Sequence, residues 1–218
     1  MQPQLAVSGY RGVWGTTLTP EIAKNFTNAF AQFTQKRNGK KILIGRDARP
    51  SGGELVTIVA ETLRDAGFDV TIGGLLPTPT VLFLVREMKF DGAVIVTASH
   101  NPPEYNGLKF VTARGMFTVE SDVAEIKSYF GASATPGMGS ITTDTTLGEK
   151  HVAHILEKSD RDLIASKHFK VVLDPINSAG AVLGPKLLEE LGCDITVING
   201  EPNGQFAHMP EPLAENLT

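Results

Sequence analysis

The sequence predicts an α/β protein in which a mixed β-sheet carries helices on both faces, a three-layer α/β/α arrangement, followed by an incomplete second α/β unit. First, short apolar segments of strand length alternate with amphipathic segments of helical length. Second, the apolar segment 107–111 is typical of a strand that returns beside the strand 91–97, which makes the sheet mixed. Third, the chain beyond residue 141 offers only two convincing strands, whereas a stable domain usually needs three or more.

The first unit opens with a helix whose start is clearly marked. In Thr19–Pro20–Glu21 the threonine is a typical N-cap, the proline suits the first helical turn, and the glutamate complements the helix dipole. Apolar residues then recur at helical spacing as far as Phe33. Residues 41–45 are a short apolar strand, and a second amphipathic helix opens at Ser51 and closes at Gly67. The remaining elements expected in this unit are an extended segment 68–72, a helix 79–86, a strand 91–97, a strand 107–111 and a helix from 119 to about 130.

Residues 131–143 are poor in large apolar side chains, which indicates a loop or a domain boundary. We therefore place the first domain at residues 1–140 and the second unit at residues 141–218. The second unit is expected to contain a helix near 149–166, a strand 169–174, a helix near 179–191 and a strand 194–198. With so few strands, its edge near 194–198 and the apolar helix face of Leu183, Leu187, Leu188 and Leu191 would stay uncovered, so we expect self-association there.

The composition excludes several classes of function. The 218 residues are 41% hydrophobic, enough for a substantial core, and the formal net charge is −4 without a long basic run. We therefore expect no nucleic-acid partner. No segment approaches the length of a membrane span, no leader pattern opens the chain, and the single cysteine, Cys193, cannot form an internal disulfide. A cytoplasmic protein without a membrane partner is the expectation.

Most of the polar residues that look out of place lie in four loops, and three of these loops follow a predicted strand. The loops are 9–12, 45–51, 77–79 and 97–102. Because ligands of open α/β folds bind at the carboxyl ends of strands, the loops could converge on one site. Each also has a plainer interpretation: an ion pair that fixes a turn, a rigid proline helix start, or a solvated arginine. Ser99 and His100 are adjacent, so on an extended chain their side chains point apart and do not form a nucleophile–base pair.

Together the loops resemble a known set. Thr97-Ala-Ser-His-Asn-Pro102, followed by Tyr105-Asn-Gly-Leu-Lys-Phe110, is similar to the active-site loop of the α-D-phosphohexomutase superfamily. This superfamily comprises the phosphoglucomutases, phosphomannomutases and phosphoglucosamine mutases. Gly9-Tyr-Arg-Gly12 and Gly45-Arg-Asp-Ala-Arg-Pro-Ser51 resemble two more of its motifs, and Asp174-Pro-Ile-Asn-Ser-Ala-Gly180 resembles the entry to its second domain. The resemblance runs in order through essentially the whole chain.

The resemblance implies a role for each motif residue. Ser99 would carry the phosphate that passes to and from a hexose phosphate, by way of a bisphosphorylated sugar. Lys109 would be the base, provided that burial or a cationic neighbour lowers its pKa, and Arg11 would hold the phosphate. His100 would join the catalytic group. Asn101, Arg46 and Asp47 would bind the substrate.

The resemblance also implies Mg²⁺, bound by the phosphate of Ser99 and by three aspartates of an Asp-Gly-Asp-x-Asp-Arg loop in the family's second domain. That loop does not occur in this sequence, and Asp174 stands alone before a proline. His151 and His154 are spaced i, i+3 on a predicted helix, where a solvated face is the favoured interpretation over a metal site.

Three interpretations of the whole chain follow. The favoured one is an N-terminal part of a phosphohexomutase, covering the first domain and roughly half of the second, that is inactive by itself. The alternative is a short non-catalytic paralogue that binds a phosphosugar or a partner protein. A serine phosphatase or hydrolase on the same loop is the third, although no Asp–His partner pattern is visible. The sequence does not indicate which sugar phosphate is used.

Overall fold

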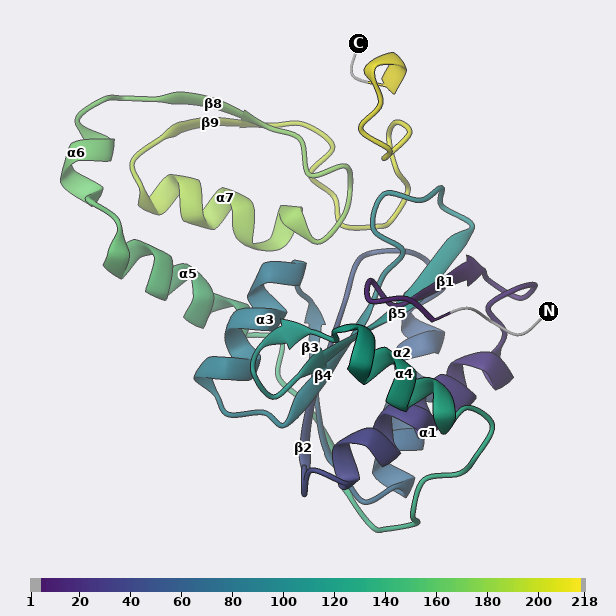
Figure 1. Cartoon of the computed structure of the whole chain (residues 1–218). Coiled ribbons are helices and arrows are strands. Elements are labelled where there is room, and N and C mark those ends of the chain that lie inside the picture. Colours follow the sequence, from purple (N-terminus) through teal and green to yellow (C-terminus); the bar gives the residue numbers. More distant parts are fainter. Residues whose placement is uncertain (1–4, 217–218) are drawn as a thin grey trace.

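A computed structural model describes residues 5–216 of the chain. Figure 1 shows a large sheet flanked by helices and a smaller second unit beyond one end of it. The strands are β1 (Tyr10–Val13), β2 (Lys41–Arg46), β3 (Asp69–Leu75), β4 (Gly92–Val96), β5 (Tyr105–Thr112), β6 (Met116–Phe117), β7 (Ser140–Thr143), β8 (Lys170–Leu173) and β9 (Asp194–Val197). The helices are α1 (Pro20–Gln35), α2 (Gly52–Asp65), α3 (Thr78–Glu87), α4 (Glu120–Ser128), α5 (Gly148–Lys158), α6 (Arg161–Ala165) and α7 (Gly180–Glu190), and a 3₁₀ turn spans Ala214–Asn216.

The large sheet is mixed, as predicted. Its strand order is β1-β5-β4-β2-β3-β7, with β6 paired to β5 off this path. The strands β4, β2, β3 and β7 run parallel, whereas β5 is antiparallel to β4 and to β1. The carboxyl ends of the parallel strands therefore meet at one end of the sheet, where ligands bind in open α/β folds.

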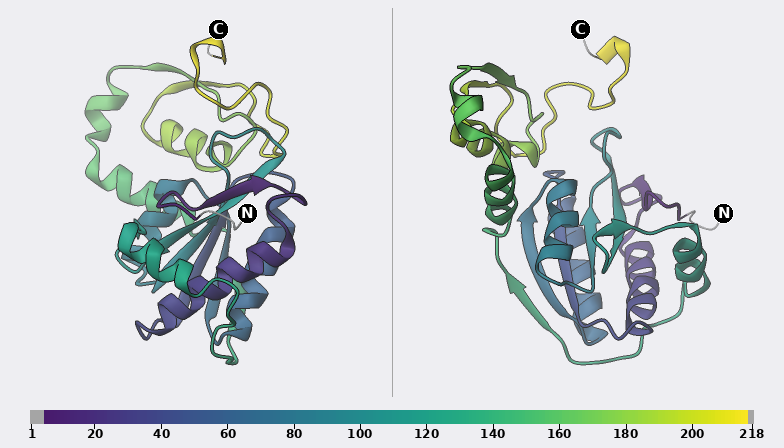
Figure 2. Two further views of the ribbon diagram at one scale, coloured as in Figure 1. Left: turned by 45° about the vertical axis from the view of Figure 1, so that its right-hand side comes forward. Right: turned by 60° about the vertical axis from the view of Figure 1, so that its left-hand side comes forward.

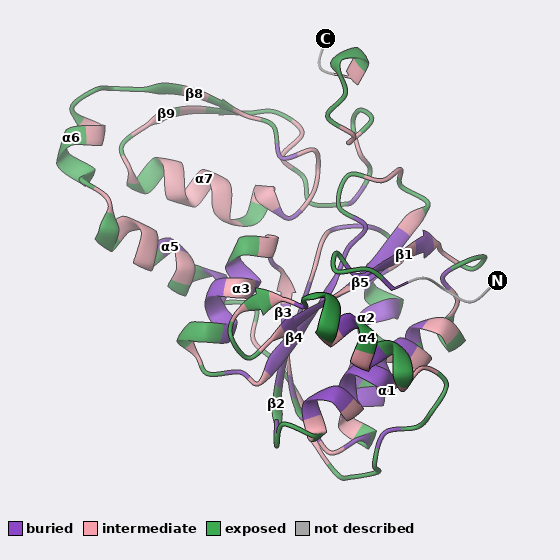
Figure 3. Ribbon diagram, in the orientation of Figure 1, coloured by how far each residue is buried: buried purple, intermediate pink, exposed green. Residues whose placement is uncertain are grey.

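Two core clusters, one on each face of the sheet, make the three layers. Along β2 successive side chains alternate between the faces: Ile42 and Ile44 pack with α1, α2 and α4, and Leu43 packs with α3. All five residues of β4 are buried because helices cover both of its faces. Figure 3 shows this buried centre, and it shows that β8, β9 and α7 of the second unit are half-buried or exposed. None of the helices between residues 5 and 216 combines the length and apolarity that a bilayer crossing requires.

The first helix begins where the sequence predicted. Thr19 is extended, its hydroxyl oxygen accepts a hydrogen bond from the Ile22 N–H at 3.3 Å, and Pro20 occupies the first turn. The predicted loop 131–143 was partly wrong, because its last four residues form β7, which pairs with β3 as an edge of the large sheet. The opening segment 9–12 was also predicted as a loop, whereas Tyr10–Val13 is a strand paired with β5.

The second unit holds two parallel strands, β8 and β9, packed with α7. Figure 2 shows it joined to the first unit through α5 beyond one end of the sheet. The single helix predicted for 149–166 is two helices, because Asp160 breaks it: the Asp160 carboxylate accepts a hydrogen bond from the Leu163 N–H at 3.0 Å and caps α6.

The face of α5 that carries His151 and His154 was expected to be solvated, but it is half-buried. Helix α5 lies against α3, and the ring of Phe83 contacts both histidines, with centroids 4.7 Å from His151 and 4.9 Å from His154. His151 Nδ1 also lies 2.9 Å from the hydroxyl of Thr80. Burial, and then the neighbouring His154, lower the pKa of His151. The two half-buried histidines therefore form part of the contact between α5 and α3.

Candidate active site

The site is built around the loop that follows β4, residues 97–105, which we call the Ser99 loop. Ser99 is exposed and has a φ of 59°, a left-handed conformation that is uncommon outside glycine. A hydrogen bond of 2.9 Å from the Ser99 N–H to the Thr97 hydroxyl supports this turn, and the Thr97 hydroxyl donates in turn to Asp47 at 2.5 Å. The loop thus presents the serine hydroxyl outward at the carboxyl end of a buried strand.

Arg49 lies beneath this loop and is fully buried. Each of its five N–H groups donates one hydrogen bond, and together they use the whole donor set of a guanidinium. The acceptors are the carboxylate of Asp47 at 3.1 Å and the carbonyl oxygens of Pro102 at 2.6 Å, Tyr105 at 2.9 Å, Ser99 at 3.0 Å and Asn101 at 2.6 Å. One side chain therefore fixes four backbone carbonyls of the Ser99 loop.

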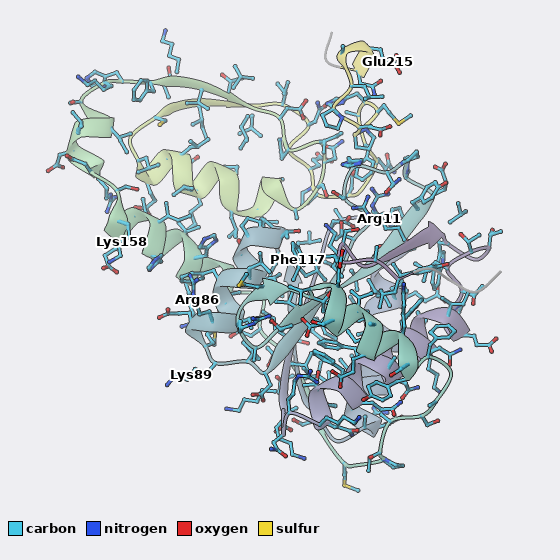
Figure 4. All side chains as sticks on the ribbon, viewed as in Figure 1. Arg11, Arg86, Lys89, Phe117, Lys158 and Glu215 are labelled. Atoms are coloured by element: carbon cyan, nitrogen blue, oxygen red, sulfur yellow. The ribbon has the colours of Figure 1, made fainter. Side chains whose placement is uncertain are left out.

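Arg11 reaches the same loop from β1. Its Nη1 donates to the side-chain oxygen of Asn101 at 2.9 Å, whereas its Nε is buried without a hydrogen-bond partner among the described residues. Arg11 pairs in register with Gly107, where a Cβ atom would come within 2.4 Å of the Tyr10 carbonyl oxygen and 3.2 Å of Arg11 Cγ. Glycine at this position lets β1 and the arginine approach the site closely. Figure 4 shows where Arg11 lies in the molecule.

Lys109 shares a face of the sheet with Arg11, since it lies two residues beyond Gly107 on β5. Its Nζ is 5.4 Å from the centroid of the Phe117 ring. Burial lowers the pKa of Lys109, and the positive charge of Arg11 lowers it further, against a smaller opposing effect of Asp47. Both conditions that a basic lysine was expected to need, burial and a cationic neighbour, are present.

The structure thus brings Ser99, Asn101, Arg11 and Asp47 into one hydrogen-bonded arrangement, with Lys109 beside it. His100 is exposed next to Ser99, and no hydrogen bond of its side chain is found among the described residues. Catalysis by His100 stays a prediction. The 77–79 loop begins α3, as its plainer interpretation held.

The predicted substrate contacts of Arg46 and Asp47 also stay predictions. Arg46 donates to the backbone oxygen of its neighbour Asp47 at 2.9 Å. The carboxylate of Asp47 is held by the Arg49 side chain and backbone N–H and by the Thr97 hydroxyl, so it lies under the loop as a support.

The residue that sequence reasoning missed is Arg49. It stands in the motif Gly45-Arg-Asp-Ala-Arg, but the sequence does not show which arginine of the motif is buried. Two arginines three residues apart around an aspartate are the signal that could have prompted the question.

The described residues do not make up a magnesium site. No group of three or more histidine, cysteine, aspartate or glutamate side chains between residues 5 and 216 could hold a metal ion. Asp174 accepts hydrogen bonds from the Ile176 N–H at 2.9 Å and the Asn199 amide at 3.1 Å, and it pairs with His208 at 3.0 Å. The Asp174 carboxylate is thus already engaged by three partners within the second unit.

An exposed serine at the carboxyl end of parallel strands, with an arginine and a lysine of lowered pKa beside it, suits an enzyme that handles phosphate. Comparison with known proteins defines the group more closely. The model of phosphoglucomutase/phosphomannomutase α/β/α domain I matches residues 4–136, and that of domain II matches residues 149–218. The chain therefore belongs to the phosphoglucomutase/phosphomannomutase family.

Two curated relatives show the same correspondence. A phosphoglucosamine/phosphogalactosamine mutase of Sulfurisphaera tokodaii is 38% identical over 96% of this chain, and a phosphoglucomutase/phosphomannomutase of Thermococcus kodakarensis is 34% identical over 96% of it. In both cases the match takes up 47% of the relative, so the chain spans about half the length of the curated relatives it matches.

Solved structures agree with this assignment. A Thermus thermophilus protein assigned as a phosphomannomutase superposes with a TM-score of 0.88 at 26% identity, covering 99% of this chain and 50% of that one. A phosphoglucomutase/phosphomannomutase family protein of Burkholderia thailandensis superposes with a TM-score of 0.73 at 27% identity, covering 94% of this chain and 46% of that one.

Proposed function

We propose that the chain supplies the phosphoryl-accepting part of a phosphohexomutase, with Ser99 as the acceptor. The observation that carries this proposal is the exposed Ser99 hydroxyl on a loop that Arg49 fixes and Arg11 reaches. In the proposed step, the Ser99 oxygen forms a bond to the phosphorus of a bisphosphorylated hexose, and the bond from phosphorus to the sugar oxygen breaks. Neutral Lys109 accepts the serine proton, and the departing sugar oxygen takes up a proton from water.

Arg11 is placed to bind the negatively charged phosphoryl group that this step transfers. A guanidinium can bind phosphoryl oxygens through two parallel N–H groups, and the buried Nε of Arg11 is a donor that no described residue uses. Binding of a phosphate beside Lys109 would in turn favour the charged lysine, which is the form reached after proton uptake. His100, Asn101, Arg46 and Asp47 complete the proposed site. The substrate is a hexose phosphate, and the compartment is the cytoplasm.

The test is phosphate uptake measured by intact mass. We expect the chain, incubated with glucose 1,6-bisphosphate, to gain one phosphate at Ser99 and the Ser99→Ala variant to gain none. Ser51, whose hydroxyl accepts a hydrogen bond from the Asn106 amide at 2.8 Å, provides a matched Ser51→Ala control that should keep the modification. Persistence of the added phosphate in Ser99→Ala would overthrow the assignment.

We further propose that mutase turnover needs more chain than these 218 residues. A fusion of the chain to the remaining half of the Sulfurisphaera tokodaii relative should convert glucose 1-phosphate to glucose 6-phosphate, whereas the chain alone should not. A coupled assay measures both proteins. Turnover by the chain alone would contradict this proposal, and a fusion that folds but only binds the sugar phosphate would favour the non-catalytic alternative.

The second unit is the proposed place of self-association. Val172 is 69% exposed and Phe169 51% exposed, and within residues 5–216 the β8–β9 pair has no third strand. The sedimentation coefficient of the chain should rise with concentration as chains associate. In the fusion the added half is expected to cover this unit, so the fusion should form particles with fewer chains. A strictly monomeric chain would end this part of the proposal.

A further inference from the structure

A segment of the second unit lies over Arg49, the side chain that supports the Ser99 loop. We call this segment, residues 199–206, the covering segment. Asn177 organises it through four hydrogen bonds, which join its N–H to the Asn199 oxygen at 2.7 Å, its carbonyl to the Gly204 N–H at 3.0 Å, its side-chain nitrogen to the Gln205 oxygen at 2.8 Å and its side-chain oxygen to the Glu201 N–H at 3.2 Å.

The covering segment contacts the first unit at Ala48 and Arg49. Gly204, at a φ of 76°, comes so close that an added Cβ would lie 1.9 Å from the Ala48 carbonyl oxygen, and only glycine fits there. The Ala48 N–H donates to the Ser178 hydroxyl at 3.4 Å. The ring of Phe206 lies over the Arg49 guanidinium, 4.9 Å from its central carbon.

We propose that Arg49 is a positioning residue through which the covering segment, by way of Phe206, controls the order of the Ser99 loop. The inference rests on the proposed function for its catalytic meaning, because the loop matters for transfer only if Ser99 accepts the phosphate. The physical link itself is independent of that function. It runs from Phe206 to the Arg49 guanidinium and from there to four loop carbonyls.

Arg49 suits this role because all five of its side-chain N–H groups already donate hydrogen bonds. A lysine offers three donors around a single point, and it cannot span the five acceptors that the planar fork reaches. The loop needs such support, since Ser99 is held in a left-handed conformation that its own sequence does not favour. An aromatic face over a buried guanidinium favours the charged, hydrogen-bonded arrangement beneath it. Movement of the covering segment would therefore be felt at Ser99.

The test measures amide hydrogen exchange in peptides covering residues 97–106 of the 218-residue chain, which requires neither phosphate nor turnover. Failure of Ser99 to accept phosphate and failure of this inference are therefore separate results. The variants are Arg49→Lys, Phe206→Leu, Phe206→Tyr and the Arg49→Lys/Phe206→Leu pair. Arg64→Lys is the matched control, since Arg64 lies at the other end of α2 with a half-exposed ion pair to Asp65.

We expect Arg49→Lys to speed exchange in the Ser99 loop by about tenfold or more, because at least two charge-assisted hydrogen bonds are lost. Phe206→Leu, which keeps apolar bulk but removes the ring face, should speed it by about threefold. Phe206→Tyr keeps the ring and should restore the original protection. The Ser99 loop of the double variant should exchange at nearly the same rate as that of Arg49→Lys, because both changes act through one guanidinium.

Three outcomes would overturn the proposal. One is a loop that exchanges at the original rate in Phe206→Leu. Another is a leucine variant as protected as the tyrosine variant, which would make Phe206 a filler of space. The third is faster exchange in all peptides of the first unit in parallel for Arg49→Lys, which would make Arg49 a residue of general stability.

Discussion

The two units of the molecule differ sharply in how they are held together. In the first unit, β4 is buried along its whole length and both sheet faces are covered by helices. In the second unit, β8, β9 and α7 contain no buried residue, and Val172 and Val182 are exposed (Figure 3). The groups proposed for chemistry sit on the well-packed first unit, whereas the second unit contributes the covering segment. The site therefore takes its geometry from the first core, and the second unit adds the contact of Phe206 with Arg49.

Local stability should follow the same division. Elements with few buried apolar contacts open at lower free-energy cost than a packed core. The second unit is held through α5 on α3 and through the covering segment on Arg49. We therefore expect it to open before the large sheet does.

The largest expected effect compares a deletion in each unit. Phe110 is 1% exposed, and its ring stacks on Phe30 at 4.7 Å between centroids. Phe110→Ala should lower the free energy of unfolding by about 3–5 kcal/mol, through lost burial and the cavity left behind. Leu188→Ala in α7, where the side chain is only half-buried, should cost about 1 kcal/mol. Urea unfolding followed by fluorescence and circular dichroism measures both variants.

Equal costs at the two positions would contradict the comparison between the units. Two separate transitions in the unmodified chain, with Leu188→Ala shifting only the earlier one, would sharpen it. If only the transition of the second unit departs from two-state behaviour, the second unit unfolds less cooperatively than the first.

The next effect concerns chemistry rather than stability. Lys109→Ala should slow phosphate uptake at Ser99 by about 10²-fold or more, the size usual for a positioned acid–base group. Because burial and Arg11 lower the pKa of Lys109 from 10.5, the rate should rise with pH through a midpoint below that value as the neutral base forms. Mass-resolved time courses at several pH values give both quantities.

Arg11→Lys gives the matched control, since it keeps a cation near Lys109 but loses the bidentate fork. Its pH midpoint should stay low while its rate falls. A pH profile that is unchanged in Lys109→Ala would remove the lysine from the proposed mechanism.

The sequence predicted those features that depend on local signals. The sequence predicted the start of α1 because Thr19 and Pro20 mark it in adjacent positions. It predicted the position of the Ser99 loop because an apolar strand precedes that loop. Strand β7 was missed because it buries little and Ser140–Thr143 contains one apolar residue, and β1 was missed because Tyr10–Val13 is short and contains an arginine and a glycine. Nothing local marks them as strands, since their pairing partners lie far along the chain.

The site divides in the same way. Residue identities at Ser99, Lys109 and Arg11 came from motif resemblance, and the sequence could state what Lys109 would need but not that burial would provide it. The role of Arg49 could not be read, because a buried arginine looks like a solvated one until the five acceptors around it are placed. The Phe206 contact joins residues of two units that are distant in sequence.

A smaller effect compares helix caps in the two units. Thr19→Ala removes the cap of α1, and Asp160→Ala removes the cap of α6; each substitution deletes one side-chain acceptor for a helix N–H. Caps of this kind are worth about 1 kcal/mol. We expect the Thr19 change to lower the global unfolding free energy and the Asp160 change to speed exchange only around residues 160–166. A global loss from Asp160→Ala would show that α6 is coupled to the main core.

The smallest effect is a pH dependence of the contact between His208, just beyond the covering segment, and Asp174. The hydrogen bond to Asp174 raises the pKa of His208 above its ordinary value of 6.5. Burial acts to raise the pKa of Asp174, but hydrogen bonds from Ile176, His208 and Asn199 outweigh it and lower the pKa from 3.8. Both side chains are partly exposed, so the pair is worth at most about 1 kcal/mol after screening.

The directions of the two pKa shifts define the pH range in which the pair stabilises the structure. The contribution of His208 is complete below pH 6.5 and is lost as the pH rises through its raised pKa, whereas that of Asp174 is lost only as the pH falls through its lowered pKa. Exchange protection of residues 199–208, corrected for intrinsic rates, should therefore be greatest between pH 3.8 and 6.5 and should decline above 6.5. His208→Gln keeps a hydrogen-bond donor but cannot titrate, and it should flatten the decline. A wild-type profile that is already flat would show that solvent exposure cancels the pair, and the covering segment would then depend on Asn177 and Phe206 alone.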